Sequence, residues 1–201
     1  MNSEMIFHFD HPHCGTIAEV AEVVGGKGAS LWAMTSKLRL PTPAGFTIGV
    51  DACRVLDKTG VTEDFTAALD TAIARLEKET GRGLGDAENP LLLAVRSGAS
   101  VSMPGMMETI LNVGITPLTL PALSDMTGNH PFALDSYQRF LEGFCKSILR
   151  IDLSVLDAQI QENKDLADHT ELLETLISGK IGAERLCDTR YLLDQCIHAV
   201  I

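Results

Sequence analysis

Residues 91–115 read LLLAVRSGASVSMPGMMETILNVGI, and this stretch decides the fold that we expect. Residues 91–96 form an apolar run that predicts a buried strand, with apolar side chains on both faces. Residues 109–114 predict a second strand because of their β-branched content. Between the two expected strands lies a loop of small residues that ends in Met-Pro-Gly-Met-Met. We therefore expect an α/β arrangement built around the strand at 91–96.

Arg96 stands where the first of these strands enters the loop. Ligands of open α/β sheets bind outside the carboxyl ends of the strands, and this guanidinium would lie at such an end. Its planar fork suits phosphate oxygens, and the small residues that follow let backbone N–H groups approach an anion closely. Arg96 is therefore a candidate phosphate ligand. The alternative is a structural arginine that is paired with a carboxylate at the end of a strand.

A second candidate is Lys27, which lies between Gly26 and Gly28 in GGKGASLWAMTSKL, residues 25–38. This segment predicts a glycine turn that opens a helix. Helix N-termini attract anions because their first N–H groups lack partners and the helix dipole is positive there. The segment is not a P-loop, since Ala21 and Gly28 stand where that motif needs Gly and then Ser or Thr. The alternative is a surface lysine in a flexible turn.

Composition excludes several classes of function. The 201 residues are 45% hydrophobic, which is enough for one ordinary domain or two small ones with a real core. The formal net charge of −11 argues against a nucleic-acid partner, because binding to a phosphate backbone needs clustered Lys and Arg. No apolar run is long enough to span a membrane, and the N-terminus does not look like a signal peptide. Five cysteines without paired spacing predict free thiols in a reducing cytoplasm.

The texture of the sequence changes near residue 115. Residues 1–115 mix short apolar runs with Gly and Pro, and they include an expected strand at 46–50 and an expected helix at 63–80. Residues 116–201 show mostly helical periodicity. We therefore predict a mixed α/β lobe at 1–115 and a small all-helical subdomain at 116–201. The apolar positions that define the helix faces are Phe65, Leu69, Ala72, Ile73 and Leu76 in the first half, and Tyr137, Phe140, Leu141, Phe144, Ile148, Leu186, Leu193, Ile197 and Val200 in the second.

The N-terminal sequence HFDHPHC brings His8, His11, His13 and Cys14 close together, and these side chains are all metal ligands in other proteins. Structural zinc usually needs two paired sets of ligands, and only one cluster is found, so we predict no metal site. Metal storage or sensing is the weaker alternative. The GRGLG sequence at 81–85 precedes its strand, whereas dinucleotide-binding loops follow one, so it is interpreted as a hinge loop.

Three stretches strongly resemble the N-terminal region of pyruvate, phosphate dikinase. They are GGKGASLWAMTSKLRLPTPAGFTI at 25–48, DAENPLLLAVRSGASVSMPGMMETILNVGI at 86–115 and TGNHPFALDSYQRFLEGF at 127–144. The resemblance covers about residues 20–150. It is specific, because SMPGMMETILN at 102–112 differs from the segment of the related phosphoenolpyruvate synthases. Residues 151–201 resemble the family only in being helical.

The resemblance implies an ATP-grasp nucleotide-binding domain, in which ATP lies between two lobes. In the family, the β-phosphoryl group of ATP passes to a histidine on a separate swivelling domain, the γ-phosphoryl group passes to inorganic phosphate, and the phosphohistidine then phosphorylates pyruvate. By position, Lys27 and Arg96 look like the family's triphosphate-binding residues, and Arg139 looks like a further phosphate-facing arginine. The loop at 97–105 looks like a lid, and we expect residues 97–107 to be mobile without nucleotide. The implied phosphate-binding residues are Lys27, Arg96, Ser97, Gly98, Ser102, Gly105 and Arg139.

In the family, a second grasp lobe follows the helical segment and supplies the magnesium-binding carboxylates. The chain has no match to that lobe, to the phosphohistidine domain or to the pyruvate barrel, and its six histidines are not in the family's histidine motif. We therefore expect a split gene product or a fragment that needs ATP and Mg²⁺ and has no turnover by itself. The implied reaction converts ATP, pyruvate and phosphate to AMP, phosphoenolpyruvate and diphosphate. The alternative is a non-catalytic remnant or interaction module, which self-associates or docks on a chain that carries the missing lobe.

Overall fold

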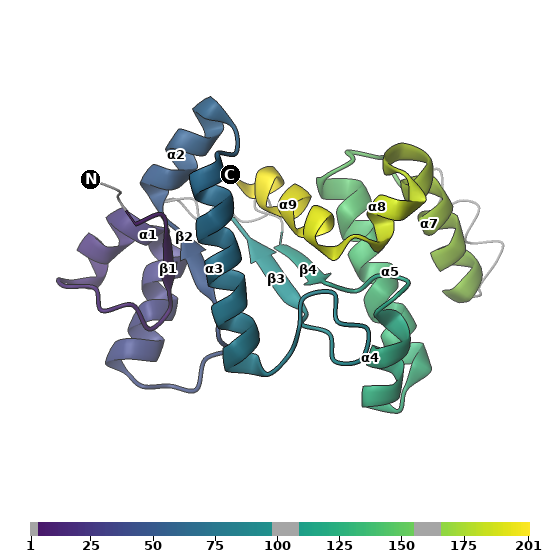
Figure 1. The fold of residues 1–201 in the computed structure, drawn as a ribbon, viewed down its shortest axis with the longest axis horizontal. Helices are drawn as coiled ribbons and strands as arrows, with labels where there is room; N and C mark the ends of the chain where they lie inside the picture. Colours follow the sequence, from purple (N-terminus) through teal and green to yellow (C-terminus); the bar gives the residue numbers. More distant parts are fainter. Residues whose placement is uncertain (1–3, 98–108, 155–165) are drawn as a thin grey trace. The chain divides into compact units, whose positions relative to one another are not determined.

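A computed structural model describes residues 4–97, 109–154 and 166–201 of the chain (Figure 1). These residues form two compact units, each described here by itself. Unit 1 consists of residues 4–81 together with Ser97 and Ile201, and unit 2 of residues 82–96, 109–154 and 166–200. The mixture of helices with small sheets confirms the coarse α/β class. The loop expected to be mobile, residues 97–107, lies outside the described residues except for Ser97.

Unit 1 contains a small antiparallel sheet. Strand β1 (Ile6–His8) pairs with strand β2 (Phe46–Ile48), and Phe7 lies opposite Thr47. The strand that the sequence predicts at 46–50 is thus confirmed, although it is shorter than expected. Helix α1 packs against β2, and helix α3 packs against β1.

Helix α1 (Ile17–Trp32) begins earlier than the sequence suggests and is interrupted at the expected glycines. Its start is a capping box, in which the Thr16 hydroxyl accepts from the Glu19 amide and the Glu19 carboxylate accepts from the Thr16 amide. Gly25 then leaves the helix, with φ 74° and ψ 164°. Lys27 therefore lies in the first turn after a break, as the glycine turn predicts. A π-helical turn, η1 (Ala33–Lys37), continues from the end of α1.

Helices α2 (Val50–Thr59) and α3 (Glu63–Thr80) complete unit 1. The sequence prediction for α3 is confirmed at both ends. The Thr62 hydroxyl caps the first turn by accepting from the Phe65 amide at 3.2 Å, and Gly81 ends the helix with a left-handed φ of 68°. All five predicted apolar positions of this helix are buried, from Phe65 to Leu76.

Unit 2 contains the strands of the opening stretch. Strand β3 (Leu93–Arg96) pairs antiparallel with β4 (Thr109–Val113), and Arg96 lies opposite Thr109. The register shifts between Leu93 and Val95, because β4 carries an extra residue there. Asn112 on β4 has a left-handed φ of 59°, which asparagine tolerates better than most residues, and its amide donates to the Ser136 carbonyl at 3.0 Å.

The environment of β3 differs from the prediction. Its residues alternate between half-buried and exposed, instead of being buried on both faces. Among the described residues, its sheet has two antiparallel strands and is not an open parallel sheet. The argument that Arg96 lies at the carboxyl edge of an open α/β sheet is therefore wrong. A six-residue apolar run does not by itself distinguish a central strand from a strand with one covered face.

Five described helices complete unit 2. They are α4 (Leu120–Thr127), α5 (His130–Ser147), α7 (Leu166–Ile181), α8 (Ala183–Cys187) and α9 (Thr189–Val200). Helix α5 contacts α4, α7 and β4, while α9 contacts both β3 and β4 (Figure 1). Four of the predicted positions on α5 are almost wholly buried, namely Tyr137, Phe140, Leu141 and Phe144. Helix α7 continues through Gly179, and the turn falls at Gly182 with φ 92°.

The strands β3 and β4 thus belong to the same compact unit as the helices, because α5 and α9 pack on them. The predicted domain boundary at residue 115 places these strands with the N-terminal part, and it stays a prediction. No helix within the described ranges is long and apolar enough to cross a membrane.

All five cysteines are free thiols, as the sequence predicts. Cys14 is exposed, whereas Cys145 and Cys196 are buried in unit 2. Burial raises the pKa of the Cys145 thiol to about 11 and that of Cys196 to about 12.

Candidate functional site

Lys27 is held against the segment that follows strand β3. The lysine is half-buried, and its Nζ donates a hydrogen bond to the Ser97 carbonyl oxygen at 2.7 Å. These two residues lie 70 positions apart in the sequence. The fold therefore brings the lysine of the glycine turn to the first residue of the loop that the sequence singled out. This is the strongest structural link between two of the predicted site residues.

Arg96 is the last residue of β3, and its side chain is exposed. The proposed structural role would need a carboxylate partner. No ion pair or hydrogen bond joins the Arg96 guanidinium to any residue in the described part of the chain. The guanidinium is thus presented to solvent at the end of the strand, directly before the residue that Lys27 contacts.

Arg139 is held by its own helix. Its Nε donates to Asp135 Oδ2 at 2.7 Å and its Nη2 to Asp135 Oδ1 at 3.3 Å, one helical turn away on α5. The hydrogen bonds to Asp135 raise the pKa of Arg139 further above its ordinary value. The side chain is 67% exposed, so the pair lies at the surface. The Asp135 carboxylate thus occupies one edge of the Arg139 guanidinium. The phosphate-facing role of Arg139 stays a prediction.

Three other predicted site residues, Gly98, Ser102 and Gly105, lie outside the described residues. The site can therefore be assessed at Lys27, Arg96, Ser97 and Arg139. Lys27 and Ser97 are brought together within unit 1, while Arg96 and Arg139 belong to unit 2.

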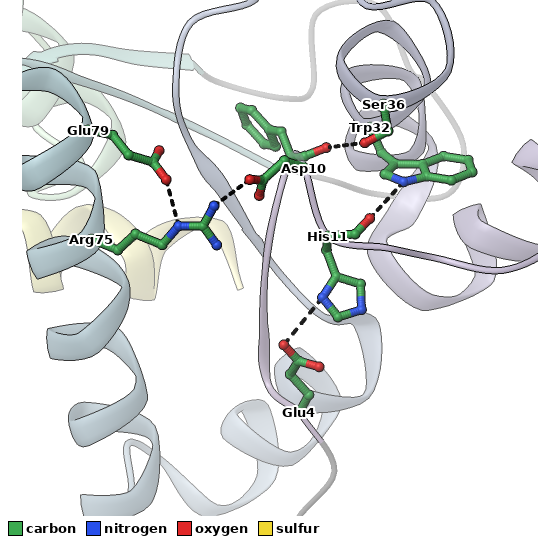
Figure 2. A network of polar contacts seen from close by, with 8 residues as sticks. Glu4, Asp10, His11, Trp32, Ser36, Arg75 and Glu79 are labelled. Atoms are coloured by element: carbon green, nitrogen blue, oxygen red, sulfur yellow. Dashed lines mark hydrogen bonds and ion pairs between the residues drawn. The ribbon is translucent and has the colours of Figure 1, made fainter.

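The N-terminal histidines pack among aromatic rings. The rings of His11 and His13 have centroids 4.4 Å apart, and the rings of Phe7 and Trp32 stack edge-on or tilted against them. The Trp32 indole donates to the His11 carbonyl at 2.9 Å, and His11 Nδ1 lies 3.4 Å from Glu4 Oε1 (Figure 2). Within the described residues, no group of three or more His, Cys, Asp or Glu side chains is arranged to hold a metal ion. Metal binding at the N-terminus stays a hypothesis.

Burial lowers the pKa of two of the N-terminal histidines, His8 and His13. The neighbouring His11 lowers the pKa of His13 further, and Arg75 makes a second contribution to the lowered pKa of His8. The neutral imidazole is therefore favoured at His8 and His13 in the folded state.

A polar network that the sequence did not predict ties the N-terminal segment to the helices of unit 1. Arg75 on α3 donates from Nε to Glu79 at 2.6 Å and from Nη2 to Asp10 (Figure 2). The Ser36 hydroxyl donates to the Phe9 carbonyl at 3.3 Å. Arg75 and Asp10 are 65 positions apart, and no spacing pattern connects them.

Part of the chain matches a known family of domains. Residues 21–71 match a family model described as "Pyruvate phosphate dikinase, AMP/ATP-binding domain", and this range includes Lys27. The chain is thus similar to a nucleotide-binding domain of a phosphotransferase.

The relatives specify the family. The chain is 39% identical to the pyruvate, phosphate dikinase of Rickettsia prowazekii over 99% of its own length and 24% of the relative. It is 43% identical to that of Entamoeba histolytica over 71% of the chain and 16% of the relative, and 47% identical to that of Giardia intestinalis over 65% and 15%. The chain belongs to the pyruvate, phosphate dikinase family, and it spans at most about a quarter of the length of these curated relatives.

Proposed function

We propose that the chain binds the phosphate end of ATP in a dikinase-type phosphotransfer. The reaction converts ATP, pyruvate and phosphate to AMP, phosphoenolpyruvate and diphosphate. The observation that carries the proposal is the hydrogen bond from Lys27 Nζ to the Ser97 carbonyl. It supports a site in which an ammonium group and the beginning of a loop rich in small residues face the same ligand.

The chemistry of these residues suits a polyphosphate. A hydrogen bond between an ammonium and a phosphate oxygen is charge-assisted and therefore stronger than one to a neutral carbonyl. Exchange of the Ser97 carbonyl for a phosphate oxygen is thus favourable for Lys27. The exposed Arg96 guanidinium adds a planar donor that can contact two oxygens of one phosphate. The role of these residues is to bind and neutralise phosphate oxygens, without a covalent step on this chain.

The finer features of the proposal follow from the family resemblance. They are an ATP-grasp arrangement, a lid formed by the loop at 97–105, and phosphate contacts from Gly98, Ser102, Gly105 and Arg139. Magnesium bound there would neutralise charge on the phosphate groups during transfer. The family resemblance implies that its ligands lie on the second grasp lobe. By itself the chain then binds phosphates and transfers none.

Calorimetry with ATP, AMP and tripolyphosphate tests this proposal. We expect ATP and tripolyphosphate to bind more tightly than AMP, and Arg96→Ala to weaken both. Arg82→Ala is the matched control, because it removes the same charge from another exposed position of unit 2. Equal affinity for AMP and ATP, or equal losses in the two variants, would contradict phosphate-end recognition.

A turnover assay tests the second half of the proposal. The pure chain is incubated with ATP, magnesium, phosphate and pyruvate, and we expect neither AMP nor phosphoenolpyruvate. Product formation that disappears in Arg96→Ala would show that the chain is catalytically complete.

The alternative function, as an interaction module, has one supporting observation. Large apolar side chains are exposed in both units, among them Leu38 at 65% and Leu118 at 59%. Scattered exposed apolar residues are common on monomers, so this observation does not favour association over phosphate binding. Sedimentation velocity, with and without a co-expressed chain carrying a second grasp lobe, distinguishes a monomer, a homo-oligomer and a heteromeric complex.

A further inference from the structure

The three glycines around Lys27 have different surroundings. Gly25 breaks the helix with a left-handed φ. A Cβ atom added at Gly26 would meet no other atom within 4 Å. A Cβ atom added at Gly28 would lie 2.9 Å from Thr47 Oγ1, 3.0 Å from Thr47 Cγ2 and 3.1 Å from Val24 Cβ. Among these three glycines, Gly28 is therefore the one at which an added side chain would meet strand β2.

The close approach at Gly28 has two sources. In a regular helix, the Cβ atoms of residues four apart are about 5–6 Å from each other, so Val24 would not crowd residue 28. The break at Gly25 brings the two segments of α1 closer than that. On the other side, Thr47 occupies the middle of β2, where its pairing with Phe7 fixes the backbone.

A methyl group at residue 28 has little room to be accommodated. Both γ atoms of Thr47 lie within 3.0 Å of the added Cβ, so a rotation about χ1 still leaves one of them facing it. Val24 is buried, and its Cβ is fixed to the backbone of the same helix. The lysine segment must therefore move away from β2. A hydrogen bond of 2.7 Å between Lys27 and Ser97 weakens with such a displacement.

We infer that Gly28 is a positioning residue, whose missing side chain lets the lysine segment pack on Thr47 and so brings the Lys27 ammonium to the Ser97 carbonyl. The relevance of this position for phosphate binding rests on the proposed function. The contact between the lysine segment and β2 is independent of the proposed function.

The test is Gly28→Ala with two readouts. The first is the rate at which an amine-specific acylating reagent modifies Lys27 without ligand, measured by mass spectrometry and referred to the exposed Lys58 in the same digest. We expect this rate to rise severalfold, because the ammonium loses its half-buried contact. The second is calorimetry with tripolyphosphate, for which the affinity falls roughly tenfold, as expected for the loss of one hydrogen bond to a charged group.

Three further variants identify the cause. Thr47→Ala in the Gly28→Ala background removes both γ atoms and should slow acylation and tighten binding again, but only in part, because Val24 Cβ still lies 3.1 Å from the added Cβ. Gly26→Ala adds the same methyl two residues away, where it meets nothing, and should leave the Lys27 acylation rate unchanged. Thr47→Ile enlarges the strand side of the contact and should expose Lys27 with Gly28 intact, which tests the inference even where Gly28→Ala folds poorly.

Two results would overturn the inference: an unchanged Lys27 acylation rate in Gly28→Ala, or no slowing of that rate when Thr47→Ala is added. Wild-type protein that does not bind tripolyphosphate, but follows the predicted acylation pattern, would refute the proposed function and leave the positioning role of Gly28 in place.

Discussion

The two compact units hold their cationic side chains in different ways. In unit 1, Lys27 is half-buried and bound to a backbone carbonyl 70 residues away in sequence. In unit 2, Arg139 is 67% exposed and bound to a carboxylate four residues away on its own helix. The tertiary fold determines the position of Lys27, whereas the position of Arg139 depends on a local surface pair. Substitution of Lys27 should therefore lower phosphate affinity more than substitution of Asp135, the partner of Arg139, changes it.

The interiors of the units differ as well. Unit 2 is centred on α5, whose aromatic residues Tyr137, Phe140 and Phe144 are at most 1% exposed. Unit 1 has strands of three residues and a helix that is interrupted at Gly25. It compensates with the polar network around Arg75 and the ring cluster around Trp32. The buried aromatic rings of unit 2 thus line one helix, whereas unit 1 combines an apolar cluster around Trp32 with the polar contacts of Arg75.

The largest effect is expected for Phe140→Ala. The ring is fully buried, and its removal leaves a cavity in the centre of unit 2. Loss of such a side chain costs about 3–5 kcal/mol of unfolding free energy. Denaturant unfolding followed by far-ultraviolet circular dichroism measures it.

Phe132→Ala is the matched control for that change, since Phe132 lies on the same helix but is 51% exposed. Equal destabilisation by the two substitutions would contradict the central role of the α5 face. Fluorescence of Trp32, the single tryptophan, reports unit 1 in the same experiment. Coincident transitions would show that the two units unfold together.

The second effect concerns phosphate affinity. Lys27→Ala removes a charge-assisted contact worth about 1.5–3 kcal/mol, so tripolyphosphate should bind roughly tenfold to a hundredfold more weakly. The melting temperature should change little in comparison. Calorimetry is the measurement, with Lys58→Ala as a control for the loss of one exposed positive charge from unit 1. Unchanged affinity in Lys27→Ala would remove this lysine from the site.

The third effect is a dependence of unit 1 on pH. The folded-state pKa values of His8 and His13 are lowered, so the unfolded chain binds protons more readily than the folded one. Stability from the neutral imidazoles is then fully present above the unfolded pKa of about 6.5 and is lost as the pH falls below it. We expect the Trp32 melting transition to move to lower temperature between pH 7 and pH 5.

His13→Gln should reduce that shift, while His198→Gln, at an exposed position of α9, should not change it. A Trp32 transition that is equally stable at both pH values, or that becomes more stable at pH 5, would contradict the neutral histidine cluster.

The smallest effect is expected for Asp135→Asn. The ion pair with Arg139 is exposed, and exposed pairs contribute little to stability. The melting temperature should stay close to that of the wild type, and tripolyphosphate affinity should rise at most a few-fold because the arginine fork is released. A large loss of stability would show that the pair is structural. A loss of phosphate affinity would show that Asp135 positions Arg139 for its ligand.

The sequence predicts those elements whose signals are local. Helix α3 is the clearest case, since the cap at Thr62, the helical spacing from Phe65 to Leu76 and the left-handed Gly81 all indicate the same boundaries. The early start of α1 was missed, although the Thr16–Glu19 capping box is a sequence signal that could have revealed it. Strand β1 has only three residues and no pattern of its own, because its pairing with β2 determines it.

The sequence predicts which residue types form the candidate site, but it does not predict how they are placed relative to one another. Glycines around a lysine, and small residues after an arginine, indicate phosphate chemistry in each segment. Nothing in the spacing shows that Lys27 meets Ser97, because that contact depends on how α1 packs against β2. The environment of Arg96 was misjudged for the same reason, since the number and direction of neighbouring strands are tertiary properties.

The buried and exposed cysteines differ in reactivity, so their alkylation can be used to follow unfolding. Thiolates are the species that react with alkylating reagents, so the buried Cys145 and Cys196, with pKa values of about 11 and about 12, are protected while unit 2 is folded. The exposed Cys14 of unit 1 reacts throughout and serves as the reference. A short pulse of reagent, read by mass at each site, therefore records the opening of unit 2 without any introduced label.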